Sequence, residues 1–175
     1  MKFTTGLCRL SYANIFEPRE DLSHNLKYSC SLIIPKEDEK QVARIKAAFK
    51  EMLEDKEILQ KVGGKVKGID LPLRDGDDKE DENYANCYYL NAKANKDHPP
   101  KVLDKDRNEV FDSSEVYSGC YVQAVLDFFP YNQSGNKGIG VGLRGIRKIK
   151  DGAPLSGGGV SDSDFDDAFL EDDLI

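Results

Sequence analysis

The chain has 175 residues, with 25 Lys and Arg against 32 Asp and Glu and a net charge of −7. Every basic residue precedes position 151, whereas residues 151–175 hold eight acidic ones. A body of about 150 residues suffices for one well-buried core and is too short for two ordinary domains. No run approaches the roughly 18 apolar residues that span a bilayer and no secretory leader is evident, so we expect a soluble protein with no membrane association.

Two strand-like runs open the chain. Residues 3–16 and 27–34 alternate apolar with polar side chains and are rich in β-branched and aromatic residues, a pattern typical of strands. We expect Pro18 and Pro35 to end these strands, because proline lacks the N–H that a ladder needs. The alternation places three residues on one face of the first strand: Cys8, Leu10 and Tyr12.

The next segment, residues 38–61, predicts an amphipathic helix. Asp38 followed by Gln41 resembles a capping box, and the pair Gly63 and Gly64 predicts the end of the helix. Apolar residues recur at helical spacing and form one stripe, which we expect to pack on the core rather than on a partner. The stripe consists of Val42, Ile45, Phe49, Met52 and Leu53.

Residues 75–82 (Asp-Gly-Asp-Asp-Lys-Glu-Asp-Glu) are too charged to be buried, so we expect an exposed loop between strands. Calcium is disfavoured because the segment lacks EF-hand spacing and the distal Glu. Asp75, Asp77 and Asp78 could instead hold magnesium, which leaves a metal-dependent nuclease open as a less favoured alternative.

Two later strands, at residues 87–93 and 120–131, can be sorted by parity. The expected core faces consist of Tyr88, Leu90 and Ala92 and of Cys120, Val122, Ala124, Leu126 and Phe128. The opposite faces consist of Tyr89, Asn91 and Lys93 and of Tyr121, Gln123, Val125, Asp127, Phe129 and Tyr131. Aromatic rings beside polar and charged groups predict a half-solvated surface.

A final strand is predicted at residues 138–150, where Ile139, Val141 and Leu143 alternate with glycines and an arginine. Residues 140–145 spell GxGxxG but open no helix, so they do not predict a dinucleotide site. Alternate glycines on one face of a strand permit tight curvature or the close approach of a ligand.

Catalytic constellations are scarce. His24 and His98 are the two histidines and have no evident nucleophile beside them, so we expect no enzyme and no metal or cofactor. The four cysteines are far apart, and we interpret them as reduced core thiols, with a zinc site or disulfides as alternatives. They are Cys8, Cys30, Cys87 and Cys120.

The distribution of charged residues along the chain is more informative. After Asp127 the chain carries five basic residues and no acid up to Lys150. Cations that bind phosphates, beside rings that stack on bases, suit single-stranded nucleic acid. The candidate nucleic-acid contacts are Arg74, Tyr89, Lys93, Tyr121, Tyr131, Lys137, Arg144 and Arg147.

Residues 151–175 are rich in Gly, Ser and Asp, a composition with too little hydrophobicity to offset the entropy of ordering. We therefore expect a flexible, disordered acidic tail after an independent domain at residues 1–150. Apolar residues interleaved with acids near the end of the tail predict a site for protein partners: Phe165, Phe169, Leu170, Asp172, Asp173, Leu174 and Ile175.

Five segments then point to a known family: residues 11–18 (Ser-Tyr-Ala-Asn-Ile-Phe-Glu-Pro), 27–29 (Lys-Tyr-Ser), 72–77 (Pro-Leu-Arg-Asp-Gly-Asp), 117–122 (Tyr-Ser-Gly-Cys-Tyr-Val) and 131–139. In this order they resemble the phage single-stranded-DNA-binding protein family over nearly the whole chain. The resemblance implies a mainly β, OB-fold-like five-stranded Greek-key barrel, here with an inserted amphipathic helix, that coats single strands in phage replication and recombination and is followed by an acidic tail.

The favoured hypothesis is sequence-nonspecific binding of single-stranded DNA in phage DNA replication, recombination and repair, in the cytoplasm of the infected bacterial host. On this hypothesis the acidic tail regulates binding and recruits phage or host replication proteins. A phage structural or protein-interaction domain without nucleic-acid binding is the alternative. Self-association and the preference for DNA over RNA stay open, because cations neutralise both backbones.

Overall fold

The computed structural model of the protein describes residues 1–155. The predicted partner-binding residues Phe165, Phe169, Leu170, Asp172, Asp173, Leu174 and Ile175, and with them most of the predicted disordered tail, lie outside the described residues. The elements are β1 (Lys2–Thr4), β2 (Cys8–Glu20), β3 (Leu26–Pro35), α1 (Glu39–Glu54), α2 (Lys56–Lys61), β4 (Arg74–Asp75), the 3-10 helices η1 (Gly76–Asp78) and η2 (Glu82–Tyr84), β5 (Cys87–Asn95), β6 (Lys101–Leu103), β7 (Tyr121–Gln133) and β8 (Asn136–Lys150).

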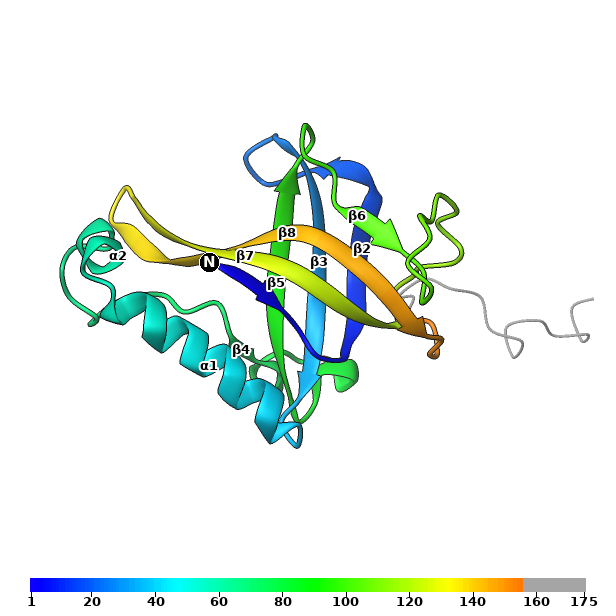
Figure 1. Cartoon of the computed structure of the whole chain (residues 1–175), viewed down its shortest axis with the longest axis horizontal. Helices are drawn as coiled ribbons and strands as arrows, with labels where there is room; N and C mark the ends of the chain where they lie inside the picture. The colour runs from blue at the N-terminus through cyan, green and yellow to red at the C-terminus, as the bar shows by residue number, and fades with distance from the viewer. Residues whose placement is uncertain (156–175) are drawn as a thin grey trace, which may run out of the picture.

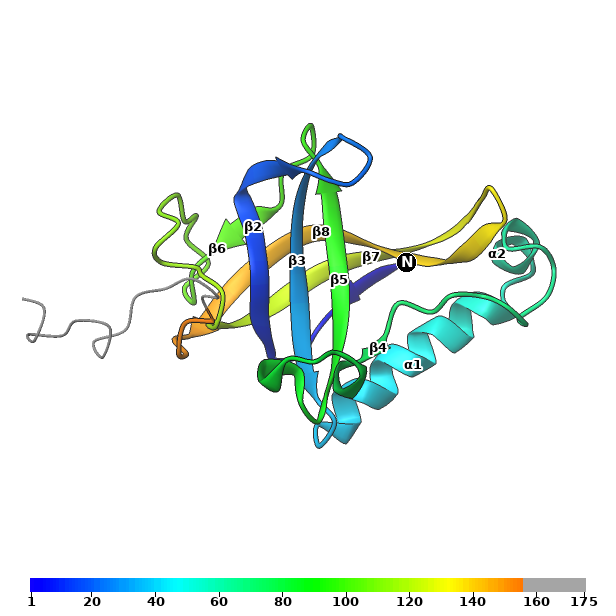
Figure 2. The same cartoon turned by 180° about the vertical axis from the view of Figure 1, so that it is seen from behind.

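Five of the strands close into a ring in the order β7, β2, β3, β5 and β8, with β8 pairing back to β7. Every junction of the ring is antiparallel except that between β5 and β8, where Lys93 pairs in parallel with Gly142. In Figure 2, β2, β3 and β5 stand side by side while β7 and β8 cross behind them. This ring confirms the mainly β, OB-fold-like barrel that the sequence predicts.

The predicted helix packs as expected but is divided in two. Its stripe is buried except for Leu53, which is partly buried. The ring of Phe49 on α1 meets that of Phe128 on β7 with centroids 4.9 Å apart. In Figure 1, α1 lies diagonally along one end of the barrel. One continuous helix over residues 38–61 is wrong, because Asp55 is extended. Its carboxylate accepts from the backbone N–H groups of Glu57 and Ile58 and so begins α2.

The N-terminal run differs from its prediction in two respects. It divides into β1, which pairs with β7, and β2, which pairs with β3. Pro18 does not end β2, which continues to Glu20. The ladder between β2 and β3 is irregular between Asn14 and Arg19, so proline lies where regular pairing is interrupted and its missing N–H costs little.

The predicted core faces of β5, β7 and β8 are confirmed except at Tyr88, which is half-buried. Leu90 and Ala92 on β5, Cys120 just before β7, and every second residue of β7 from Val122 to Phe128 are at most 1% exposed. Residues 140–145 lie inside β8 and open no helix. The four cysteines are free thiols, three of them buried. No helix within residues 1–155 has the length and apolar character to cross a membrane.

Candidate nucleic-acid interface

An open groove of about 980 Å³ runs over the outer face of the barrel where β5 and β8 meet. We call it the β5–β8 groove. It is bordered by the solvent-facing side chains of β5, by two rings from the end of β7 and by the glycines of β8. The principal lining residues are Lys27, Arg74, Asn91, Lys93, Asn95, Phe129, Tyr131, Gly140, Gly142 and Arg144.

Two aromatic rings border this groove. Phe129 is 43% exposed, and a Cβ placed on Gly140 would overlap its ring, so the glycine is needed for the ring to lie against β8. The Tyr131 hydroxyl donates to Asp70 Oδ2 at 3.3 Å. Partial burial, and then the nearby Asp70 carboxylate, raise the pKa of Tyr131, so the phenol stays protonated and its ring uncharged at neutral pH.

The cations of the groove come from four separate elements or loops. Lys27 lies on β3, Arg74 on β4, Lys93 on β5 and Arg144 on β8. Arg74 pairs with Asp70 at 3.0 Å, and Lys27 Nζ donates to Asn95 Oδ1. The positive charges therefore border the groove on several sides, where a phosphate backbone passing along it could meet them in turn.

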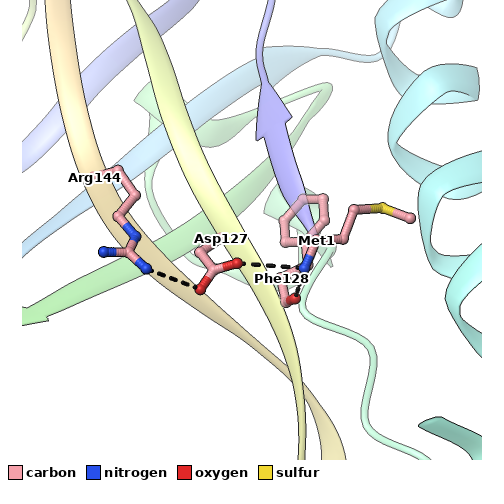
Figure 3. Close-up of polar contacts among 4 residues, drawn as sticks. All are labelled: Met1, Asp127, Phe128 and Arg144. Atoms are coloured by element: carbon pink, nitrogen blue, oxygen red, sulfur yellow. Dashed lines mark hydrogen bonds and ion pairs between the residues drawn. The ribbon is translucent and has the colours of Figure 1, made fainter. Parts of the chain in front are cut away.

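Three acidic residues line this groove, Asp70, Asp97 and Asp127, and the charge of Asp127 is already balanced (Figure 3). Its Oδ1 lies 3.3 Å from the Met1 ammonium, and its Oδ2 lies 3.4 Å from the Arg144 guanidinium. The same ammonium donates to the carbonyl oxygen of Phe128 at 2.7 Å. With Asp70 paired to Arg74 as well, two carboxylates of the groove have their negative charge offset by a cation.

A second groove, of about 580 Å³, lies beyond Arg144, which together with Asp127 lines both. We call it the β6–β8 groove. It has no aromatic ring among its lining residues; its apolar floor includes Leu103, Val125 and Ile146. Its cations are Lys2, Lys101, Arg107, Arg144 and Arg147.

The structure brings together about half of the candidate contacts predicted from the sequence. Arg74, Lys93, Tyr131 and Arg144 line the β5–β8 groove, and Arg147 lines the β6–β8 groove. The Arg147 guanidinium is held by the Lys105 carbonyl oxygen, at 2.7 Å from Nη2 and 3.2 Å from Nε.

Three other candidates lie outside both grooves. Tyr89 packs edge-on against Tyr84 with centroids 5.1 Å apart. The Tyr121 ring lies near two cations, those of Arg9 and Lys150. Lys137 is at the β7–β8 hairpin, where its Nζ would lie 3.3 Å from a Cβ on Gly63. That these three residues contact nucleic acid stays a prediction.

Sequence reasoning missed Phe129 and Lys27. Phe129 shares its face of β7 with Tyr131, so the parity that selected Tyr131 could also have selected Phe129. Lys27 carries no comparable signal, because its place in the groove depends on the pairing of β3 with β5, in which Lys27 is opposite Asn95.

The acidic loop is engaged with a lysine. Lys36 Nζ lies 2.8 Å from Asp75 and 2.7 Å from Asp77, and these hydrogen bonds hold the pKa of both carboxyls below the usual range. Within residues 1–155 no three His, Cys, Asp or Glu side chains gather as metal ligands. The arrangement therefore gives the nuclease alternative no support from geometry.

Comparison with known proteins shows which family the chain belongs to. The family model described as the single-stranded-DNA-binding protein of Enterobacter phage Enc34 matches residues 1–175. The chain belongs to this family. The protein p50 of Acyrthosiphon pisum secondary endosymbiont phage 1 is 33% identical over 187 residues, covering 100% of this chain and 99% of p50. The Enc34 family consists of binding proteins rather than enzymes, as the sequence predicts.

Solved structures agree with this membership. The Enc34 single-stranded-DNA-binding protein in complex with single-stranded DNA has a TM-score of 0.74 at 25% identity, covering 89% of both chains. A second structure of the Enc34 single-stranded-DNA-binding protein has a TM-score of 0.68 at 26% identity, covering 93% of this chain and 88% of that one. Bacteriophage T7 gp2.5, at 16% identity and a TM-score of 0.61 over 92% of this chain and 98% of that one, shares the fold.

Proposed function

We propose that the protein binds single-stranded DNA without sequence preference along the β5–β8 groove. The observation that carries this proposal is the meeting of two aromatic rings and four cations in one open groove. Bases stack on the rings of Phe129 and Tyr131, and phosphates lie against Lys93 and Arg144. Stacking is tolerant of sequence because every base has a π-face, and the membership in the Enc34 family supports this assignment.

In this proposal the protein protects single strands during phage DNA replication, recombination and repair in the cytoplasm of the infected bacterium. Such a role requires binding that does not depend on sequence and that ends when another protein needs the strand. Cations and rings without base-edge readout suit the first requirement. The acidic tail supplies the second, by competing for cations and by recruiting phage or host replication proteins.

The β6–β8 groove is where we propose that the tail docks. Its cationic rim and apolar floor complement a segment in which Phe169, Leu170 and Leu174 flank a run of three acids, whereas its lack of rings makes it a poor site for stacked bases. Arg144 lines both grooves, so a docked tail takes one cation from the DNA path. Tethering keeps the tail at an effective concentration in the millimolar range for a short flexible linker.

Titration with an unstructured oligonucleotide tests the proposal. The chain has eight Tyr and no Trp, so intrinsic fluorescence reports tyrosine rings and should be quenched when bases stack on them. The titration is run with and without magnesium, and the oligonucleotide is then checked for length. Quenching without cleavage is the expected result. Cleavage in magnesium would favour a nuclease, and no binding in either buffer would favour a structural or protein-interaction role.

A further inference from the structure

Tyr12 has a backbone conformation that tyrosine rarely adopts. Its φ is +46° although it lies inside β2. Bulky residues seldom enter this left-handed region, because Cβ approaches the following carbonyl oxygen. The other non-glycine residues with positive φ among residues 1–155 lie in turns or bends between strands and helices: His24, Asn86, Arg107 and Ser134.

The cause is a β-bulge. Ser11 pairs with Ser31 and Asn14 with Ser29, so three steps on β2 match two steps on β3 and one extra residue interrupts the ladder. A left-handed residue in such a bulge is ordinarily glycine, and bulges next to functional sites re-aim side chains. The bulge turns Tyr12 away from the core face that Cys8 and Leu10 share, and leaves it 58% exposed.

The exposed ring belongs to an aromatic and cationic cluster on the outside of the barrel. The Tyr12 ring lies 6.4 Å from that of Tyr84, which is fully buried and bonds Ser11 through its hydroxyl at 2.9 Å. Lys79 Nζ lies 4.7 Å from the Tyr12 ring centroid, 4.4 Å from that of Tyr84 and 5.2 Å from that of Tyr89. The cluster therefore offers one solvated ring beside one cation.

The cluster adjoins the β5–β8 groove. Tyr89 is two residues before Asn91 on the same face of β5, and Asn91 lines the groove. Across the sheet, Lys93 of the groove pairs with Ser29 on β3, and Ser29 pairs with Asn14, two residues after Tyr12. Neighbouring strands lie about 4.8 Å apart, so roughly 10 Å of sheet separates the groove from the strand that carries Tyr12. This face, formed by β2, β3 and β5, is in front in Figure 2.

We propose that Tyr12 is a base-stacking residue: a single strand that leaves the β5–β8 groove crosses β3 onto β2, where a base stacks on the Tyr12 ring and a phosphate meets Lys79. This rests on the proposed function and extends its binding site to a second face of the barrel. Local backbone strain persists where the surrounding structure imposes it and is concentrated at binding sites. A tyrosine in a glycine-favouring position is explained if its ring is needed there.

The substitution Tyr12→Gly separates this role from a structural one. Glycine adopts a positive φ without steric cost, so the variant should unfold at a temperature no lower than the native protein. Loss of a stacked base should weaken binding of a long oligothymidine roughly 5- to 140-fold. Tyr12→Phe keeps the ring and should bind as tightly as the native protein. Phe111→Ala, which removes a ring 82% exposed outside both grooves, should change neither property.

Oligonucleotide length adds an internal control. Site sizes per OB-fold run from about 4 to 16 nucleotides, so Tyr12→Gly should be compared on oligothymidines near both limits. We expect a loss of affinity for the long oligonucleotide and little change for the short one, which the groove alone can hold. Equal affinity of Tyr12→Gly and the native protein for the long oligonucleotide, or an equal loss on both lengths, would overturn the proposal. If the native protein binds neither, the proposed function itself fails.

Discussion

The ring of Phe129 occupies the space that a side chain at position 140 would need, so Gly140 and Phe129 depend on each other across the β7–β8 ladder, where they are direct partners. Gly140→Ala should push the ring out of place and weaken DNA binding several-fold, up to the roughly 1–3 kcal/mol of one stacked base. Gly142→Ala is the matched control, since its Cβ would meet Asp127 at an ordinary 3.5 Å. Equal affinities of the two variants would show that the Phe129 position is irrelevant to binding.

Binding should weaken steeply with salt. If the four cations of the β5–β8 groove each neutralise a phosphate, the slope of log K against log salt for a single strand is about −2.8, or roughly a 50-fold loss of affinity between 50 and 200 mM salt. Lys93→Ala should reduce the magnitude of this slope by about 0.7. The slopes come from fluorescence titrations at several salt concentrations, and a flat response would remove the electrostatic part of the proposal.

Deleting residues 156–175 should raise the affinity for single-stranded DNA, most strongly at low salt. The deleted segment carries seven of the eight acids that follow Lys150, and attraction between exposed charges is screened beyond about 10 Å at 0.1 M salt. Titration of the full-length and truncated proteins side by side measures the effect. A tail that only improves solubility would leave the two dissociation constants equal. Charge reversal at Lys101 and Arg107 in the full-length protein should reproduce part of the gain if the tail docks in the β6–β8 groove.

Acid should loosen the loop that follows β4. Lys36 lowers the pKa of Asp75 and Asp77 in the folded protein, so this contribution to stability is complete above the unfolded pKa of about 3.9 and is lost as the pH falls through the lower folded values. The thermal midpoint should therefore decline below about pH 4. Lys36→Met should show a smaller decline over the same interval, and an identical decline would mean that other carboxylates dominate.

The thiols should differ in reactivity. Burial raises the pKa of Cys8 and of Cys30 to about 12 each, which leaves almost no thiolate near pH 8. Burial also raises the pKa of Cys87 and of Cys120, but Cys87 is half-buried and open to a reagent, whereas Cys120 is fully buried. A disulfide reagent should therefore label one thiol quickly in the native protein and all four after denaturation. Cys87→Ser should abolish the fast phase; if the fast phase persists, another cysteine is accessible.

The sequence predicted those features that depend on periodicity. Alternation on β7 and β8 identified the buried face correctly, and helical spacing identified the stripe of α1. The prediction failed where one residue changed the local geometry. The bulge at Tyr12 turns its side chain away from the face predicted for it, and the extended Asp55 divides the helix. Beside the bulge at Tyr12 lies a contact distant in sequence, the bond from the Ala13 N–H to Ser118 Oγ at 3.0 Å. The break at Asp55 is local, since its carboxylate accepts from the N–H groups of Glu57 and Ile58.

The candidate site was predictable only in part for a related reason. Arg74, Lys93, Tyr131 and Arg144 were selected by chemical type, and the barrel then brought them together. Tyr89 and Tyr121 are of the same type but were placed elsewhere, because parity specifies the side of a sheet and not the position around a closed ring. Position around the ring depends on strand order, which a single sequence does not reveal.

Strand pairing around the barrel is uneven, and the β5–β8 groove follows the junction with the fewest paired positions. Lys93 and Gly142 are the one pair of Cα partners that joins β5 to β8, whereas β3 and β5 are paired along nine positions. A DNA strand that contacts Lys93 on β5 and Arg144 on β8 links the two strands of this junction, which we call the β5–β8 seam. Part of its binding free energy would then appear as resistance of the seam to opening, so that the occupied barrel would exchange its β5 and β8 amide hydrogens more slowly than the empty one.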